Sequence, residues 1–235
     1  MAKIIIQIRK ELQEKGDAKV RASEKRFFKE PIKTRGVRSA EVVAIGKKYF
    51  REIKNLPKKE ILALCEELFA SGYNDEARIA CDWSYNLRQT YAVADLRVFK
   101  NWLEKYIDNW AKCDTFCNHT VGAFVEMYPE TVADLKTWTH SRNRWLRRAA
   151  AVSLIIPVKR GKFLPDVFAI ADILLLDGDD LVQKGYGWML KVAATVHQKE
   201  VLAYVMKNKA RMPRTALRYA IEKMPASLKK QAMGK

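Results

Sequence analysis

The sequence predicts an all-α protein built as a superhelix of antiparallel helix pairs, an α-solenoid. Apolar residues recur with the helical period along most of the 235 residues, and the alternation typical of strands is nearly absent. The breaks between helical segments are short, so consecutive helices are expected to lie antiparallel. Pairs of helices recur at intervals of roughly 35–45 residues without a sharp motif, which is typical of stacked repeats.

Each expected helix is bounded by residues that favour turns or end helices. The expected helices span residues 3–15 (ended by Gly16 and Asp17), 17–28, 39–54 (after Gly36), 58–71 (between Pro57 and Gly72), 75–90, 93–106, 110–127 (before Pro129), 130–139, 143–156 (before Pro157), 163–175 (after Gly161), 180–196 (after the turn DGDD at 177–180), 198–208, 213–223 (between Pro213 and Pro225) and 226–233.

The chain shows no Gly/Ser-rich linker and no shift in composition, so residues 1–235 are expected to form a single domain. Stacked helix pairs of the HEAT-like kind curve and leave a concave groove, whereas a pocket enzyme needs a deep cavity. A HEAT-like α-solenoid with a concave basic groove is therefore the predicted architecture. A compact all-α bundle is the alternative.

The chain is strongly basic, with 44 Lys and Arg against 27 Asp and Glu, for a formal charge of +17. Such an excess of positive charge destabilises the folded state through self-repulsion unless a polyanion neutralises it. Nucleic acid is the first candidate, because each contacted phosphate releases condensed counterions. A membrane surface and a basic protein without a polyanionic partner remain the alternatives.

Basic residues gather in four places, near which acidic residues are sparse, and this favours phosphate contact over ordinary surface balancing. The candidate DNA-binding residues are Arg35 and Arg38 in KTRGVRS at 33–39, Arg147 and Arg148 in RNRWLRR at 142–148, Lys159 and Arg160 in VKRGK at 158–162, and Arg214 in KNKARMPRTALR at 207–218.

The cysteines do not form a metal motif. Cys65, Cys81, Cys113 and Cys117 all fall inside apolar helical patterns, and no CxxC spacing is present. Buried free thiols are therefore expected, with neither a metal nor a cofactor. The start of the chain predicts an amphipathic helix, not a signal peptide, and no apolar run is long enough to span a bilayer. We expect a reduced, cytoplasmic monomer without a membrane partner.

The stretch NWAKCDTFC at 109–117 holds a tryptophan and an aspartate four residues apart. A helix through 110–114 places Trp110 and Asp114 on one face. From this stretch alone, Asp114 is an N-cap for the following segment, an ion-pair partner or a catalytic carboxylate. Most of the six tryptophans are expected to fill the core, but Trp110 could also present its π face to a sugar or a base.

Two further motifs accompany this pair. One is NRWLRRAA at 143–150, where an arginine pair precedes a helix face of small residues, and the other is QKGYGWMLK at 183–191, with two glycines and Trp188. With W-x-x-x-D at 110–114, their order and spacing resemble the AlkD-like family of bacterial DNA alkylation repair glycosylases, which are HEAT-like solenoids. The resemblance extends from GVRSAE at 36–41 to ALRYAIEKM at 216–224.

The resemblance assigns roles to individual residues. It makes Asp114 the catalytic carboxylate, Trp110 a wall of the active site, Arg148 a contact to the DNA backbone and Trp188 a second aromatic contact. Phe27 stands where the family often has a tyrosine, so a hydroxyl contact to DNA is missing there. With these distant motifs counted, we interpret Asp114 as catalytic.

The function that the resemblance implies is excision of cationic alkylated purines, 3-methyladenine and 7-methylguanine, from duplex DNA in base excision repair. A cationic base is already a good leaving group, so one carboxylate near the developing positive charge suits the reaction and no strong acid is needed. Two rival hypotheses stay open: a non-catalytic protein that binds branched or distorted DNA, and a scaffold for an acidic protein partner.

Overall fold

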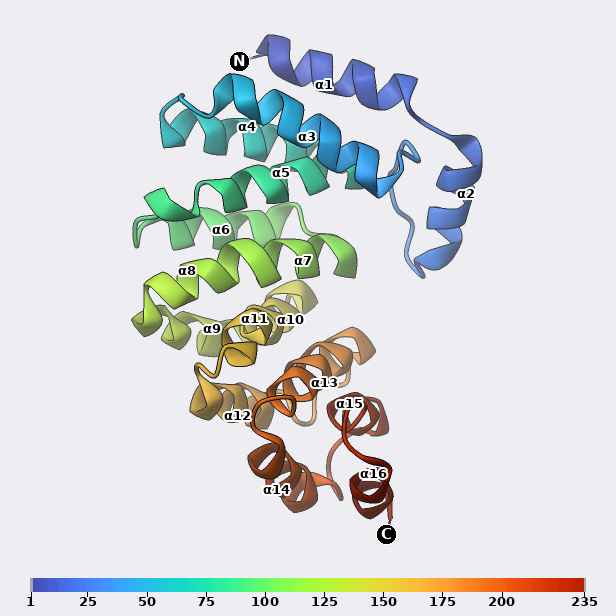
Figure 1. Ribbon diagram of the computed structural model, residues 1–235, viewed down its shortest axis with the longest axis vertical. Coiled ribbons are helices and arrows are strands. Elements are labelled where there is room, and N and C mark those ends of the chain that lie inside the picture. The colour runs from blue at the N-terminus through green and yellow to red at the C-terminus, as the bar shows by residue number, and fades with distance from the viewer. Residues whose placement is uncertain (1, 235) are drawn as a thin grey trace. The chain divides into compact units, whose positions relative to one another are not determined.

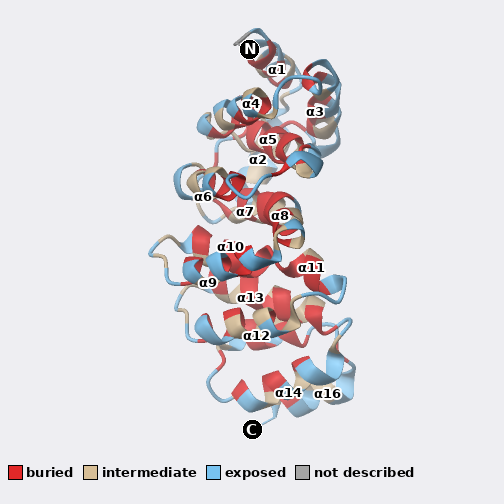
Figure 2. Ribbon diagram, turned by 90° about the vertical axis from the view of Figure 1, so that its left-hand side faces the viewer, coloured by how far each residue is buried: buried red, intermediate tan, exposed pale blue. Residues whose placement is uncertain are grey.

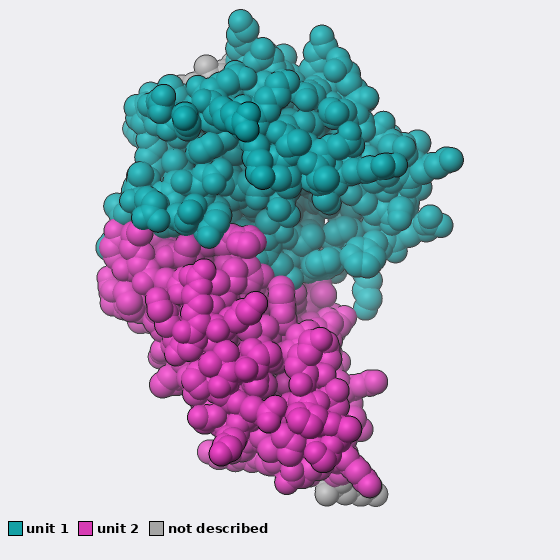
Figure 3. All heavy atoms as spheres, viewed as in Figure 1, with its two compact units in different colours: residues 1–116 teal, residues 117–235 magenta. Residues whose placement is uncertain are grey.

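The structure is a computed structural model that describes residues 2–234, which divide into two compact units between Phe116 and Cys117 (Figure 3). Every regular element in these residues is a helix, and the one pairing of extended backbone is an isolated bridge between Lys33 and Tyr73. The all-α prediction is confirmed. That the whole chain acts as a single domain with a concave groove stays a prediction.

Unit 1 stacks its helices in the order of the chain (Figure 1). Its elements are α1 (Ala2–Glu14), α2 (Ala18–Phe27), α3 (Ser39–Ile53), α4 (Lys58–Ala70), α5 (Asn74–Asn86), the 3-10 helix η1 (Arg88–Thr90), α6 (Asp95–Lys105) and α7 (Trp110–Phe116). Helices α1, α3, α5 and α7 pack on one another in succession, and α4 packs against α5. This layered succession within the unit is the arrangement that an α-solenoid has.

Unit 2 follows the same plan. Its elements are the π-helix η2 (Cys117–Val121), α8 (Gly122–Met127), the 3-10 helix η3 (Pro129–Thr131), α9 (Val132–Trp138), α10 (Arg144–Val152), α11 (Ile155–Lys159), α12 (Leu164–Ile173), α13 (Asp180–Ala193), α14 (Gln198–Asn208), α15 (Arg214–Ala220) and α16 (Ala226–Met233). Helix α13 is central, because α10, α11, α12 and α15 all pack against it. Its inward residues are buried (Figure 2).

Two of the expected helices are interrupted. The segment predicted over 75–90 is α5, which ends at Asn86, followed by the 3-10 helix η1. The segment predicted as a helix over 143–156 is α10 followed by α11, with a break at Ser153 and Leu154. Pro157 explains the break, since proline has no amide hydrogen to donate and its ring clashes with the carbonyl four residues earlier, which is that of Ser153. The segment predicted over 110–127 is helical throughout, but a turn of π-helix separates α7 from α8.

The core contains half of the aromatic side chains and all of the thiols. The buried tryptophans are Trp83, Trp102, Trp138 and Trp145. Trp110 and Trp188, the two that the sequence singled out, are only half-buried. All four cysteines are buried with free thiols, as predicted, and burial raises the pKa of Cys65 and of Cys81. Among residues 2–234 no helix combines the length and the apolar character that crossing a membrane requires.

The contact between α13 and α15 requires a glycine at position 187. A β-carbon on Gly187 would lie 2.7 Å from Cβ of Tyr219 and 2.9 Å from the carbonyl oxygen of Ala216. Gly187→Ala is therefore expected to lower the free energy of unfolding by about 1–3 kcal/mol, because the two helices must separate. Gly178→Ala, which meets nothing within 4 Å, is the matched control. Equal midpoints of denaturant unfolding for the two variants would contradict this packing.

Candidate catalytic and DNA-binding residues

Helix α7 begins at Trp110, and its N-cap is Asn109 instead of Asp114. The side-chain Oδ1 of Asn109 accepts a hydrogen bond from the amide of Lys112 at 3.1 Å, and its carbonyl accepts one from the amide of Cys113 at 3.1 Å. Asp114 lies in the interior of α7. The interpretation of Asp114 as an N-cap is therefore wrong, because the helix starts one turn before it.

Helical phase divides α7 into two faces. Lys112, Cys113 and Phe116 are buried and form the inward face. Trp110 and Asp114 lie one turn apart on the other side and are both half-buried. The shared face that the sequence predicted for this pair is present, and it is the open face of α7.

Two phenylalanines from α2 and the residue after it lie against Trp110. The ring of Phe28 stacks on the indole with centroids 5.3 Å apart and an interplanar angle of 22°. Phe27 meets the same indole edge-on at 5.6 Å. Phe27 is 71% exposed, which is unusual for a large apolar side chain. We name Phe27, Phe28 and Trp110 the aromatic cluster.

A cavity of about 260 Å³ lies beside the aromatic cluster, wholly within unit 1. Its lining consists of Glu24, Phe27, Phe28, Val37, Ser39, Val42, Asn74, Asp75, Arg78, Cys81, Ala111, Lys112 and Thr115. Burial raises the pKa of the Glu24 carboxyl; the Thr34 hydroxyl opposes this rise, and the Asp75 carboxylate adds to it. The sequence did not predict this cavity, and Asp114 is not part of its lining.

Arg148 occupies a packed position on α10. Its side chain is buried, and its guanidinium Nη1 donates to the carbonyl of Leu181 at the start of α13. A β-carbon on Gly185 would lie 3.2 Å from Cγ of Arg148, so the glycine makes room for the arginine. Trp188 lies three residues beyond Gly185 on α13 and is half-buried. Arg148 and Trp188, both predicted from the sequence to contact DNA, thus lie on α10 and α13, and these two helices pack together.

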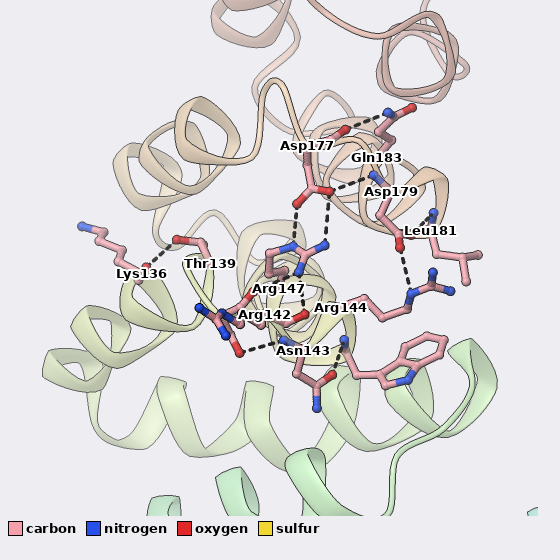
Figure 4. A network of polar contacts seen from close by, with 12 residues as sticks. Lys136, Thr139, Arg142, Asn143, Arg144, Arg147, Asp177, Asp179, Leu181 and Gln183 are labelled. Atoms are coloured by element: carbon pink, nitrogen blue, oxygen red, sulfur yellow. Dashed lines mark hydrogen bonds and ion pairs between the residues drawn. The ribbon is translucent and has the colours of Figure 1, made fainter.

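The other arginines of α10 bind the acidic turn before α13 (Figure 4). The Nε of Arg147 lies 2.6 Å from Asp177 Oδ2, and its Nη1 donates to the carbonyl of Ser141 at 2.9 Å. The Nε of Arg144 lies 2.8 Å from Asp179. The expectation that acidic partners are sparse here was wrong, because the turn at 177–180 is distant in sequence but adjacent in the fold.

The remaining candidate cations fall into two groups. Arg35 is held inside unit 1, with Nη2 2.7 Å from Glu76 and the guanidinium carbon 3.9 Å from the centre of the Tyr73 ring. Arg160 pairs with Glu126 but remains exposed. Arg38, Lys159 and Arg214 are exposed. Within residues 2–234, Lys159 and Arg214 form no ion pair.

Comparison with known proteins places the chain in a family. The sequence model of the family described as "DNA alkylation repair enzyme" matches residues 8–224, nearly the whole chain. The chain belongs to this family. Membership gives the protein a role in DNA repair, with DNA as its partner.

The fold of this DNA alkylation repair protein agrees with that of a solved structure described as a "Predicted DNA alkylation repair enzyme from Enterococcus faecalis". The two share 15% sequence identity and a TM-score of 0.81, over 90% of this chain and 98% of the other. At that identity the likeness shows the fold alone. No curated protein sequence matches this chain.

The geometry also adds residues that sequence reasoning missed. Phe28 was not singled out, although it makes the closest stacking contact with Trp110. Asn109 was missed as well, although an asparagine directly before a helical pattern is a strong N-cap signal. No group of His, Cys, Asp and Glu in the described chain is arranged to hold a metal ion.

Proposed function

We propose that the protein is a DNA glycosylase that excises cationic alkylated purines, such as 3-methyladenine and 7-methylguanine, from duplex DNA. The observation that carries this proposal is the open face of α7, where Asp114 lies one turn from Trp110, whose indole packs against Phe27 and Phe28. Family membership supports the alkylated substrate, and the charge of +17 supports the polyanionic partner.

The proposed reaction needs few groups. The bond between C1′ and the base nitrogen breaks, the base keeps the electron pair and becomes neutral, and positive charge develops on the sugar. The Asp114 carboxylate stabilises that charge, and water then adds to C1′ with loss of a proton, which leaves an abasic site. Trp110 excludes water from one side and offers its π face to the cation, a contact of roughly 0.5–2 kcal/mol.

The DNA contacts in the proposal are those of the exposed cations and the two half-buried indoles. Arg38, Lys159 and Arg214 are proposed to contact phosphates, which fixes the position of the duplex without reading sequence. Arg148 is proposed to contact the DNA backbone from its packed position, in which its guanidinium donates to the carbonyl of Leu181. Arg35 and Arg147 are better placed to support the fold, because both are committed to carboxylates within the protein.

The direct test is incubation of the purified protein with methylated duplex DNA, followed by chromatography of the released bases. Release of 3-methyladenine or 7-methylguanine above the spontaneous rate supports the proposal. DNA binding without release would favour a protein that binds distorted DNA, and the absence of salt-sensitive binding would favour a protein-interaction scaffold.

A salt titration tests the phosphate contacts. On a log–log plot of affinity against salt, Lys159→Ala and Arg214→Ala are each expected to reduce the slope by about 0.9, because each removes one phosphate contact. The reduction should be the same for any duplex sequence. Lys100→Ala is the control, since Lys100 already pairs with Glu104 on α6 at 2.7 Å. A slope unchanged in both test variants would remove these residues from the interface.

A further inference from the structure

A lysine is buried on the inward face of α7. The side chain of Lys112 is only 3% exposed, although lysine is among the residues least often buried. Its ammonium donates to the carbonyl of Gly72 at 2.8 Å and to Asp108 Oδ2 at 2.9 Å. The first of these bonds joins the first turn of α7 to the turn that precedes α5, and the second holds the segment directly before α7.

Asn109 makes a second connection between the same two elements. Its Nδ2 donates to Asn74 Oδ1 at 2.9 Å and to Asp108 Oδ1 at 2.7 Å. The two oxygens of Asp108 therefore each accept from one of these donors. Asn74 is the first residue of α5, and its backbone amide donates to the carbonyl of Lys33 at 2.8 Å. We name Asn74, Asp108, Asn109 and Lys112 the polar lock.

The polar lock is a poor solution if stability is its only purpose. Removing an ammonium from water is costly, and an apolar side chain of similar volume is often at least as stabilising in such a position. What the polar lock supplies is a fixed position for the first turn of α7. Its directional hydrogen bonds set the rotation of the helix about its axis and its position along that axis, both of which apolar packing leaves adjustable. Lys112 lies two residues from both Trp110 and Asp114, on the opposite side of the helix.

We infer that the polar lock sets the orientation of the open face of α7, and that Lys112 and Asn74 are positioning residues for base excision. The inference rests on the proposed function. Phe27 and Phe28 contact the indole of Trp110, while the polar lock fixes the backbone of the first turn of α7. Neither Lys112 nor Asn74 needs to touch DNA, because they act through the position of Trp110 and Asp114.

Paired variants at Asn74 test the inference. Asn74→Ala removes the acceptor for Asn109, whereas Asn74→Asp keeps an oxygen there and suits the first turn of α5. Asn74→Ala is expected to lower the single-turnover rate of base release about tenfold, since small displacements of reacting groups are costly. DNA affinity should stay unchanged, and Asn74→Asp should keep the wild-type rate. Lys112→Met, which keeps an unbranched stem, is expected to behave like Asn74→Ala.

The position of the indole is measured separately. In protein labelled with 5-fluorotryptophan, the resonance of Trp110 is identified by its loss in Trp110→Phe. It should shift or broaden in Asn74→Ala and Lys112→Met, and stay in place in Asn74→Asp. Lys100→Met, which breaks the exposed pair with Glu104, is the matched control and should change neither readout.

Wild-type rates and an unmoved Trp110 resonance in Asn74→Ala and Lys112→Met would overturn the inference. An equal loss of rate in Asn74→Asp would also overturn it, since that variant keeps the acceptor. If Lys112→Met does not fold, the two Asn74 variants decide. If the wild-type protein releases no base, the proposed function fails, and the fluorine resonance alone decides whether the lock positions α7.

Discussion

Asp114→Asn is expected to reduce the single-turnover rate of 7-methylguanine release by roughly 10²–10³-fold, which is the range seen when one preorganised electrostatic group is removed from an active site. The amide has nearly the shape of the carboxylate but no charge to offer the developing cation. Because Asp114 is half-buried inside α7 and does not cap the helix, the substitution should leave the fold and DNA affinity nearly unchanged.

Two controls accompany this variant. Asp134→Asn changes an exposed carboxylate on α9 by the same chemistry and should release the base at the wild-type rate. Thermal unfolding of Asp114→Asn should resemble that of the wild type. A wild-type rate in Asp114→Asn would make the carboxylate structural only, and a variant that fails to fold would do the same.

Lesion charge is expected to govern which bases are released. On single-lesion duplexes the protein should release 3-methyladenine and 7-methylguanine at least about 10³-fold faster than uracil or 8-oxoguanine, a difference of about 4 kcal/mol in activation free energy. A neutral base needs a proton before it leaves, and the proposed reaction assigns no residue the role of a general acid. Bulkier cationic purines should also be accepted, since Asp114 is not part of the cavity lining.

The panel is run under single-turnover conditions with the same duplex sequence around each lesion. An undamaged duplex and Asp114→Asn on each substrate provide the backgrounds. Efficient release of uracil would contradict the leaving-group argument. Release limited to one cationic purine would show that the shape of the base matters and would direct attention to the cavity beside Phe28.

Much of the fold follows from local sequence. The helical period places α3 and α4 within one residue of their observed bounds, because their apolar faces are regular and the turn residues Gly36, Pro57 and Gly72 flank them. The break between α10 and α11 was missed, although Pro157 marks it in the sequence. A proline is tolerated in the first turn of a helix, so its presence alone does not tell where the preceding helix ends.

The candidate site was predicted only in part. The shared face of Trp110 and Asp114 follows from their spacing, which is a local property of any helix. The ion pairs of Arg35 with Glu76 and of Arg147 with Asp177 do not follow from local sequence, because each joins residues 30 or more positions apart. Burial of Lys112 was likewise unpredictable, since the turn that accepts its hydrogen bond lies 40 residues earlier.

Base excision by Asp114 is decided by the single-turnover rate of 7-methylguanine release from a defined duplex by the wild-type protein, compared with spontaneous depurination of the same duplex. Release is expected well above the spontaneous rate, with an abasic site as the second product, and most of the enhancement should be lost in Asp114→Asn. A rate equal to the spontaneous one, at protein concentrations that saturate the duplex, would contradict base excision by this protein.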